Sequence, residues 1–189
     1  MAGKKIGILA LQGAFIEHEE AISCCGHIPL EVRTKEDLHE VDALIIPGGE
    51  STTIGKILVK FGLEEEIKKR YDEGMPIWGT CAGMILLAKE IAEIDQPRLG
   101  LMDIRVRRNG FGRQVESFET DLDIKGLGKA KGVFIRAPFV EKVWDQAEVL
   151  ATFEDRIVMV RQNKLLATAF HPELTSDLTI HKYFIEMAS

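Results

Sequence analysis

The chain has 189 residues, of which 46% are hydrophobic and 29% charged, and its formal net charge is −6. This length suits one hydrophobic core, so we expect residues 1–189 to form a single domain. The negative charge argues against nucleic acid or an anionic membrane as the main partner, because both favour basic patches. No apolar run approaches the roughly 20 residues that span a bilayer. Three cysteines, two of them adjacent, make no disulfide framework, so a reducing cytoplasm is the expected location.

The first half of the chain alternates strand-like and helix-like segments. Apolar, strand-like runs cover residues 4–11, 28–33, 43–46 and 77–78. Amphipathic, helix-like runs cover residues 14–25, 52–61, 63–73 and 84–91. Strands that alternate with helices need crossover connections, so this half of the chain predicts a largely parallel sheet covered on both faces.

The second half predicts an antiparallel extension of the same α/β domain. Between residues 102 and 168 the apolar runs are short and β-like, and glycines separate them. A meander is expected from three strands, residues 149–153, 157–161 and 165–170, with turns at Glu154-Asp155 and Gln162-Asn163. A closing helix is expected over residues 176–187, with Thr175 or Ser176 as its cap.

A cysteine between two glycines is the most informative feature of the sequence. The segment Gly79-Thr80-Cys81-Ala82-Gly83 joins a predicted strand to a predicted helix, and it has the form of a nucleophile elbow. Glycines are needed there because the sharp turn strains the nucleophile and flanking Cβ atoms would collide. The helix N-terminus favours a thiolate, and the N–H of Ala82 can stabilise an oxyanion. A buried structural cysteine is the alternative, and the strand–helix context makes it the weaker one.

His171 is the candidate base for this cysteine. It ends an apolar strand and is followed by Pro172 and Glu173. Proline favours an extended conformation at the preceding residue, so His171 and Glu173 point to the same side. The carboxylate can then fix the imidazole tautomer, as the third group of a catalytic triad does. A merely solvated histidine at a strand end is the alternative, and it becomes weaker beside the cysteine elbow.

The other four histidines show no carboxylate in an orienting position within an apolar setting. We expect His18 and His39 to be exposed, because their sequence surroundings are polar. His27 follows a glycine that ends a predicted helix, and His181 lies on the closing helix. We therefore predict no catalytic role for these four histidines.

Together, the Cys81 elbow and His171-Pro172-Glu173 resemble the class I (triad) glutamine amidotransferases. Five segments narrow the resemblance to the glutaminase subunits of pyridoxal 5′-phosphate synthases, the vitamin B6 branch: residues 47–52, 79–88, 108–114, 134–138 and 170–174. The resemblance runs from the first strand to the last helix. It implies one amidotransferase domain with a flavodoxin-like, layered αβα fold, a central mostly parallel sheet and an antiparallel β extension.

The resemblance also implies the reaction and the residues that bind the substrate. Glutamine and water would give glutamate and ammonia through a Cys81-His171-Glu173 triad, with the amides of Gly49 and Ala82 around the oxyanion. The residues placed around glutamine are Gly48, Gly49, Glu50, Arg108, Ile135 and Arg136. An arginine suits the α-carboxylate of glutamine, and a carboxylate such as Glu50 suits its α-ammonium. A solvated surface charge is the alternative for Arg108, which lies in a cluster of arginines.

The resemblance further implies a partner. We expect no metal or organic cofactor, and the sequence shows no metal-ligand spacing. Ammonia would be used in a separate, barrel-shaped synthase subunit within a large hetero-oligomer, and Gln12 lies in the region that the family uses at this interface. An ordinary turn residue is the alternative for Gln12. Two other functions stay open: a stand-alone cysteine hydrolase of the peptidase or γ-glutamyl hydrolase type, and a binding module that has lost its chemistry.

Overall fold

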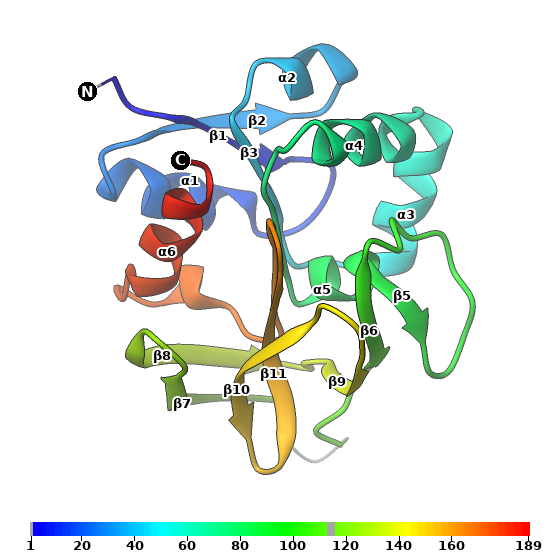
Figure 1. Cartoon of the computed structure of the whole chain (residues 1–189), viewed down its shortest axis with the longest axis vertical. Coiled ribbons are helices and arrows are strands. Elements are labelled where there is room, and N and C mark those ends of the chain that lie inside the picture. The colour runs from blue at the N-terminus through cyan, green and yellow to red at the C-terminus, as the bar shows by residue number, and fades with distance from the viewer. Residues whose placement is uncertain (1, 113–115) are drawn as a thin grey trace.

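The computed structural model describes residues 2–112 and 116–189 (Figure 1). Its first half contains β1 (Lys5–Leu9), α1 (Phe15–Cys24), β2 (Ile28–Val32), α2 (Lys35–His39), β3 (Ala43–Ile46), α3 (Ser51–Lys60), α4 (Leu63–Asp72), β4 (Ile77–Thr80) and α5 (Ala82–Leu87). Its second half contains β5 (Ala88–Ile91), β6 (Met102–Arg107), β7 (Ser117–Ile124), β8 (Gly128–Ile135), β9 (Phe139–Val143), β10 (Glu148–Phe153), β11 (Arg156–Gln162), β12 (Leu165–Thr168), the 3₁₀ turn η1 (Pro172–Leu174) and α6 (Thr179–Met187). Within these residues, no helix has the length and apolar character that crossing a membrane requires.

A mixed sheet forms the centre of the molecule. Its strand order is β2-β1-β3-β4-β12-β11-β9-β6-β5, and β10 pairs with β11. The five strands from β2 to β12 are parallel, whereas β11 and β9 run antiparallel to their neighbours. Helices α1 and α6 lie on one side of the parallel strands, and α3, α4 and α5 lie on the other (Figure 1). The layered αβα fold with an antiparallel extension, expected from the sequence, is confirmed.

The parallel strands other than the edge strand β2 are buried along most of their length. Every residue of β3 and β4 is buried, as expected for strands that helices cover on both faces. Trp78 of β4 is fully buried, and its ring lies 5.5 Å from the ring of Phe184 on α6. Its indole nitrogen donates a hydrogen bond to Thr168 Oγ1 at 3.1 Å. This core therefore fixes β4 and β12 against each other and against α6.

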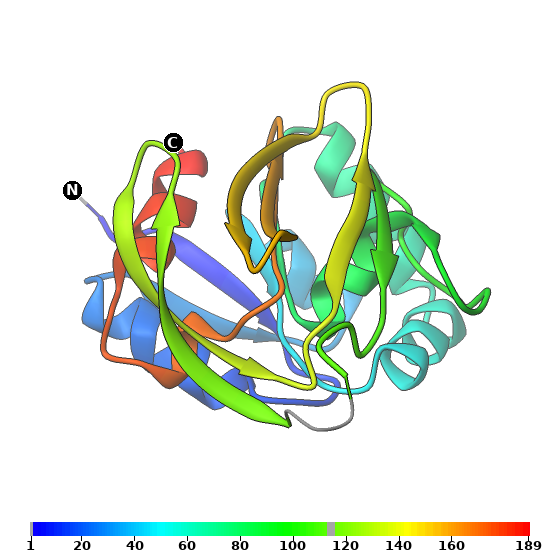
Figure 2. The same ribbon diagram turned by 90° about the horizontal axis from the view of Figure 1, so that it is seen from below.

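A separate hairpin, β7–β8, packs beside the parallel half of the sheet. Figure 2 shows it as a long, curved ribbon beside α6. The backbone N–H of Lys131 on β8 donates to Asp177 Oδ2 at 2.9 Å. The backbone N–H of His171 donates to the carbonyl of Val133 on β8 at 2.7 Å. The hairpin thus holds the segment that follows β12.

The prediction of a helix over residues 84–91 is wrong for its last four residues, 88–91. Helix α5 ends at Leu87, and residues 88–91 form β5, which pairs parallel with β6. The carbonyls of Leu86 and Leu87 accept hydrogen bonds from Leu99 and Leu101, at 2.7 and 2.9 Å, instead of from a further helical turn. Long-range backbone pairing therefore ends this helix, and no local signal in the sequence marks the change.

The closing helix also differs from its prediction. It begins at Thr179 rather than at residue 176, and neither Thr175 nor Ser176 caps it. Instead, Thr175 Oγ1 accepts from the backbone N–H of Asp177 at 3.2 Å, and Asp177 Oδ1 accepts from that of Thr179 at 2.9 Å. Two successive side-chain turns therefore occupy the residues that were expected to be helical.

The short helix α2 is absent from the sequence prediction. Thr34 Oγ1 accepts from the backbone N–H of Asp37, and the Asp37 carboxylate accepts from the backbone N–H of Thr34. This reciprocal arrangement is a capping box with aspartate in place of the usual glutamate. Leu38 buries its side chain fully and anchors the helix to the core.

Two glycines allow α5 to start very close to β3 and β4. A Cβ on Gly83 would lie 2.2 Å from the carbonyl oxygen of Ile46, at the end of β3. A Cβ on Gly79 would lie 2.4 Å from the backbone carbonyl of Gly83. Any larger residue would therefore push the first turn of α5 away from the sheet.

We expect Gly83→Ala to lower the free energy of unfolding by about 1–3 kcal/mol, because the added methyl group overpacks against the Ile46 carbonyl. Urea denaturation measures the change. Gly126→Asn is the control, since no atom lies within 4 Å of its Cβ and asparagine tolerates its φ of +78°. An equal loss of stability in both variants would contradict this explanation.

Candidate active site

Four loops meet at the carboxyl ends of β1, β3, β4 and β12, which are neighbours in the sheet. They carry Gln12, Gly48-Gly49, Cys81 and His171, which line one pocket of about 570 Å³. Parallel sheets place binding sites at such strand ends. Further lining residues are Glu50, which caps α3, Ala82 of α5, Ile135 at the end of β8, and Arg108 and Arg136 in the loops after β6 and β8. The pocket therefore brings together the residues expected at glutamine, and only Glu173 of the proposed triad lies outside its wall.

Cys81 occupies the turn between β4 and α5. Its backbone has φ 51° and ψ −102°, a conformation that residues with a Cβ rarely adopt. Its N–H donates to the carbonyl of Thr168, the last residue of β12, at 2.8 Å. The side chain opens into the pocket at the start of α5, where unpaired backbone N–H groups and the helix dipole favour negative charge.

His171 and Glu173 are in contact, as the sequence predicts, but the extended segment expected between them is wrong, because residues 172–174 form a 3₁₀ turn. The distance from His171 Nδ1 to Glu173 Oε1 is 2.6 Å. The His171 side chain is 9% exposed and faces the pocket, whereas the Glu173 side chain is fully buried. Pro172 begins the turn η1, which bends the chain so that the carboxylate lies beside the imidazole. The other imidazole nitrogen, Nε2, is therefore left available on the ring that faces the pocket.

Electrostatic interactions among Cys81, His171 and Glu173 favour the charged forms of His171 and Glu173. Burial lowers the pKa of His171, but interactions with Cys81 and with the Glu173 carboxylate outweigh burial and raise that pKa to about 10. Burial favours neutral Glu173, yet the imidazoles of His18 and His171 lower the pKa of Glu173 below its usual value. An imidazolium next to a buried carboxylate is the arrangement that a triad needs.

The glycine loop after β3 packs directly against the histidine. A Cβ on Gly48 would lie 2.5 Å from His171 Cε1, so only glycine fits beside the ring. A Cβ on Gly13 would lie 1.7 Å from the carbonyl oxygen of Gly48, which shows how closely the loop after β1 approaches. Gln12 Oε1 accepts a hydrogen bond from the backbone N–H of Glu50 at 2.7 Å. The loops after β1 and β3 therefore hold each other in place.

Glu50 and Arg108 bring opposite charges to one end of the pocket. Arg108 Nη2 lies 3.4 Å from Glu50 Oε1. The Glu50 carboxylate also caps α3, because it accepts from the backbone N–H groups of Thr52 and Thr53 at 3.2 and 2.7 Å. Burial raises the pKa of Glu50, but these hydrogen bonds outweigh burial and lower it. Glu50 is therefore a charged group whose position the helix fixes.

Another part of the pocket wall comes from the end of the β7–β8 hairpin. Ile135 is the last residue of β8, and Arg136 follows with a positive φ of 42°. The N–H of Arg136 donates to the carbonyl of Glu116 at 2.8 Å, which fixes this turn. The family-like segment that starts at Arg108 ends with Arg113 and Gln114, which lie outside the described residues.

The expected exposure of His18 is wrong, because its side chain is fully buried. His181 lies on the closing helix as expected and is also fully buried. His18 Nε2 lies 3.6 Å from Glu173 Oε2, so a carboxylate does stand beside it. A signal was present: His18, Ala21 and Ile22 form the buried stripe of α1 at helical spacing. Glu17 and Glu19, which flank His18 in the sequence, are partly exposed at the edges of this stripe.

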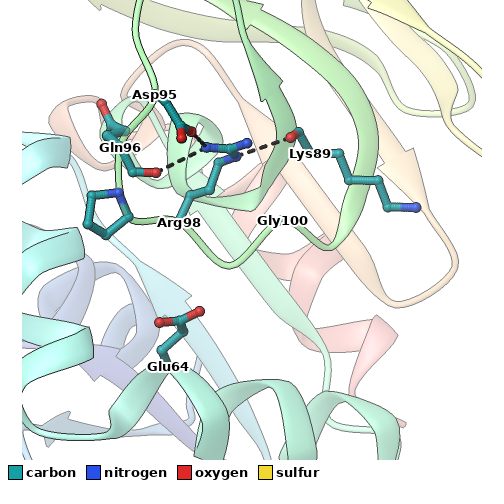
Figure 3. A pocket seen from close by; sticks show the side chains of 7 residues that line it. Glu64, Lys89, Asp95, Gln96, Arg98 and Gly100 are labelled. Atoms are coloured by element: carbon teal, nitrogen blue, oxygen red, sulfur yellow. Dashed lines mark hydrogen bonds and ion pairs between the residues drawn. The ribbon is translucent and has the colours of Figure 1, made fainter.

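Gln96 is a pocket neighbour that the sequence did not reveal. Its Oε1 accepts from Ser51 Oγ at 3.4 Å and from Arg108 Nη1 at 3.5 Å. Its loop also borders a second hollow, shown in Figure 3, where Arg98 donates to Asp95, to the Gln96 carbonyl and to the Lys89 carbonyl. Among the residues that the structure describes, no group of three or more His, Cys, Asp or Glu side chains is arranged to hold a metal ion.

Comparison with known proteins is consistent with this geometry. Residues 8–189 match the SNO glutamine amidotransferase family. The chain is 59% identical over 184 residues to the pyridoxal 5′-phosphate synthase subunit PdxT of Pelotomaculum thermopropionicum, covering 96% of this chain and 94% of that one. It is 62% identical over 186 residues to the PdxT subunit of Herpetosiphon aurantiacus, with 95% and 98% covered. A crystal structure of a glutamine amidotransferase superposes with a TM-score of 0.94 at 55% identity, covering 97% and 98%.

The raised pKa of His171 should make part of the stability depend on pH. Because its pKa rises from 6.5 to about 10 on folding, the stabilisation is complete below about pH 6.5 and is lost as the pH approaches about 10. We expect the stability advantage of the protein over His171→Asn to shrink across this window, as measured by urea denaturation. His39→Asn, at an exposed position, is the control. A constant advantage across the window would contradict the assigned ion pair.

Proposed function

The chain belongs to the SNO glutamine amidotransferase family, and we propose that Cys81, His171 and Glu173 are its catalytic triad. It is a glutaminase that supplies ammonia for the synthesis of pyridoxal 5′-phosphate. The observation that carries the triad is the 2.6 Å contact between His171 and the buried Glu173, with Cys81 in a strained turn of the same pocket.

Cys81 is the nucleophile of the proposed reaction. Its thiolate attacks the side-chain amide carbon of glutamine, and the carbonyl π electrons move to oxygen. The imidazolium of His171, favoured by the raised pKa, gives its proton to the departing nitrogen, so that ammonia leaves and a glutamyl thioester remains. The now neutral His171 takes a proton from water, the hydroxide attacks the thioester, and glutamate leaves as the Cys81 thiolate returns.

Two backbone amides are proposed to stabilise the oxyanion. Ala82 is the first residue of α5, and its N–H belongs to the helical turn that has no partner within the helix. Gly49 lies in the loop after β3, lines the same pocket as Ala82 and has a φ of +154°. Donors of this kind strengthen as charge develops on oxygen, so they favour the transition state over the bound substrate.

Arg108 and Glu50 are proposed to bind the amino-acid end of glutamine. Their side chains already face each other at 3.4 Å, which places a positive and a negative group side by side. An α-carboxylate fits the guanidinium fork, and an α-ammonium fits the carboxylate. Gly48, Ile135 and Arg136 would form the remaining walls of the substrate pocket.

A synthase subunit is the proposed partner, since the named relatives are subunits of pyridoxal 5′-phosphate synthase. We propose a large, cytoplasmic hetero-oligomer in which Gln12 lies at the interface. The hydrogen bond from the Glu50 N–H to Gln12 Oε1 connects that position to the glycine loop. A partner that moves Gln12 would therefore also move the loop beside His171.

Cys81→Ala should abolish ammonia release from glutamine, because no other group replaces the attacking sulfur. The assay contains the synthase subunit, and the loss is expected to reach the background rate, about 10⁴-fold or more. Cys24→Ala, an exposed cysteine on α1, should keep the full rate. Activity retained in the Cys81 variant would contradict the assignment of the nucleophile.

Arg108→Lys should raise the KM for glutamine roughly tenfold and change kcat less, because lysine keeps the charge but cannot form the paired hydrogen bonds to a carboxylate. Steady-state glutaminase kinetics with the synthase subunit measure both constants. Arg105→Lys, on β6 but outside the pocket, is the matched control. An unchanged KM in the Arg108 variant would remove this residue from the substrate site.

A further inference from the structure

Two buried histidines lie beyond the carboxylate of the proposed triad. His18 is on α1 and His181 on α6, helices that lie side by side in both views (Figures 1 and 2). His18 Nε2 lies 3.6 Å from Glu173 Oε2, and His18 Nδ1 lies 3.0 Å from His181 Nε2. Glu173 therefore faces one imidazole with each oxygen: His171 with Oε1 and His18 with Oε2.

The chemistry of these groups sets the direction of the hydrogens. An ionised carboxylate accepts but cannot donate, so its contact with His18 is attractive when Nε2 carries a hydrogen. The Thr80 hydroxyl, whose Oγ1 lies 3.5 Å from the same nitrogen, then shares that N–H as a second acceptor. Neutral His18 then carries a lone pair on Nδ1, which accepts the Nε2–H of His181. The remaining nitrogen, His181 Nδ1, has no hydrogen-bond partner within the described residues, as suits a lone pair. All donors in this chain point toward Glu173.

The surroundings keep His18 neutral and fixed. Burial lowers the pKa of His18 despite the charges of Glu173 and Glu17, and His171 lowers it further. Burial and His18 lower the pKa of His181 to about 3, against the raising effects of Glu173 and Asp177. The ring of Trp78 packs edge-on against His18, with the ring centres 5.4 Å apart. The imidazole of His18 therefore has one orientation in the core.

Glu173 Oε2 depends on this histidine. The oxygen is buried and makes no hydrogen bond shorter than 3.5 Å within the described residues. At 3.6 Å, the approach of His18 is an electrostatic contact rather than a full hydrogen bond. Such a contact is stronger in the dry interior than it would be in water. Without it, this buried charged oxygen would lose its contact with an imidazole, and the carboxylate could turn away from His171.

We propose that His18 is a positioning residue for the triad: its Nε2–H faces Glu173 Oε2 and holds the carboxylate in the orientation in which Oε1 meets His171. The proposal rests on the proposed function of Cys81, His171 and Glu173, and extends that site by one buried histidine. A carboxylate held at both oxygens cannot rotate, so the His171 ring keeps the tautomer and direction that proton transfer requires.

Three substitutions test this role through ammonia release measured with the synthase subunit. His18→Gln places an amide N–H near the position of Nε2, whereas His18→Asn places it near Nδ1, out of reach of Glu173. Ile22→Ala is the control, because it removes buried volume one turn further along α1 and takes no polar group from the histidine pair. Thermal unfolding of each variant shows how much stability the substitution costs.

We expect His18→Asn to lower kcat at least about tenfold with little change in KM, and His18→Gln to recover most of the rate. The acid limb of the pH profile of His18→Asn should move to higher pH, because Glu173 then keeps its proton to higher pH. Ile22→Ala should keep most of the rate at a comparable loss of stability. A wild-type rate and profile in His18→Asn would overturn the proposal, as would an equal loss of rate in Ile22→Ala.

A measurement on the unsubstituted protein covers the case in which the variants do not fold. Nitrogen-15 NMR of the histidine side chains should show neutral His18 with its proton on Nε2 at neutral pH. A proton on Nδ1 instead would overturn the proposal. Failure of the proposed function gives a different result. In that case the unsubstituted protein releases no ammonia from glutamine in the presence of its synthase subunit, and the positioning role is contradicted as well.

Discussion

The backbone conformation of Cys81 is the constraint on which the rest of the site depends. A φ of 51° at a residue with a Cβ costs of order 1–3 kcal/mol, so the surrounding fold must enforce it. Glycines at 79 and 83 allow the close contact with β3, and the Cys81 N–H is bonded to Thr168 at 2.8 Å. That bond ties the elbow to β12, the strand that leads into His171. Nucleophile and base are therefore held by neighbouring strands of one rigid sheet.

The second requirement is a charged carboxylate inside the core. Burying Glu173 without partners would make it neutral, and a neutral acid could not stabilise the His171 imidazolium. The fold meets this requirement by placing an imidazole beside each of its oxygens, one from the loop after β12 and one from α1. The β7–β8 hairpin completes the frame, because Val133 holds the backbone of His171. The order of the triad thus depends on elements far apart in the sequence.

Local patterns were enough to predict the parallel sheet, the elbow at Cys81 and the contact between His171 and Glu173. Each depends on neighbouring residues: apolar runs, paired glycines, and a glutamate two residues after a histidine. The contact of His171 with Glu173 is made through a 3₁₀ turn and not through the extended segment inferred from Pro172. The change from α5 to β5 at Ala88 depends on pairing with β6, which no local pattern encodes. The burial of His18 depends on α6 covering α1, although its helical spacing with Ala21 and Ile22 marks the buried stripe. Charged neighbours in the sequence hid that stripe.

The central claim is that Cys81 becomes covalently attached to the glutamyl group during turnover. The most direct test is to mix the protein and its synthase subunit with glutamine, quench with acid within one turnover, and identify the modified peptide by mass spectrometry. The mechanism predicts a glutamyl thioester on the peptide that contains Cys81, with no adduct on Cys24 or Cys25. Ammonia release without any adduct on Cys81, or an adduct on another residue, would contradict it.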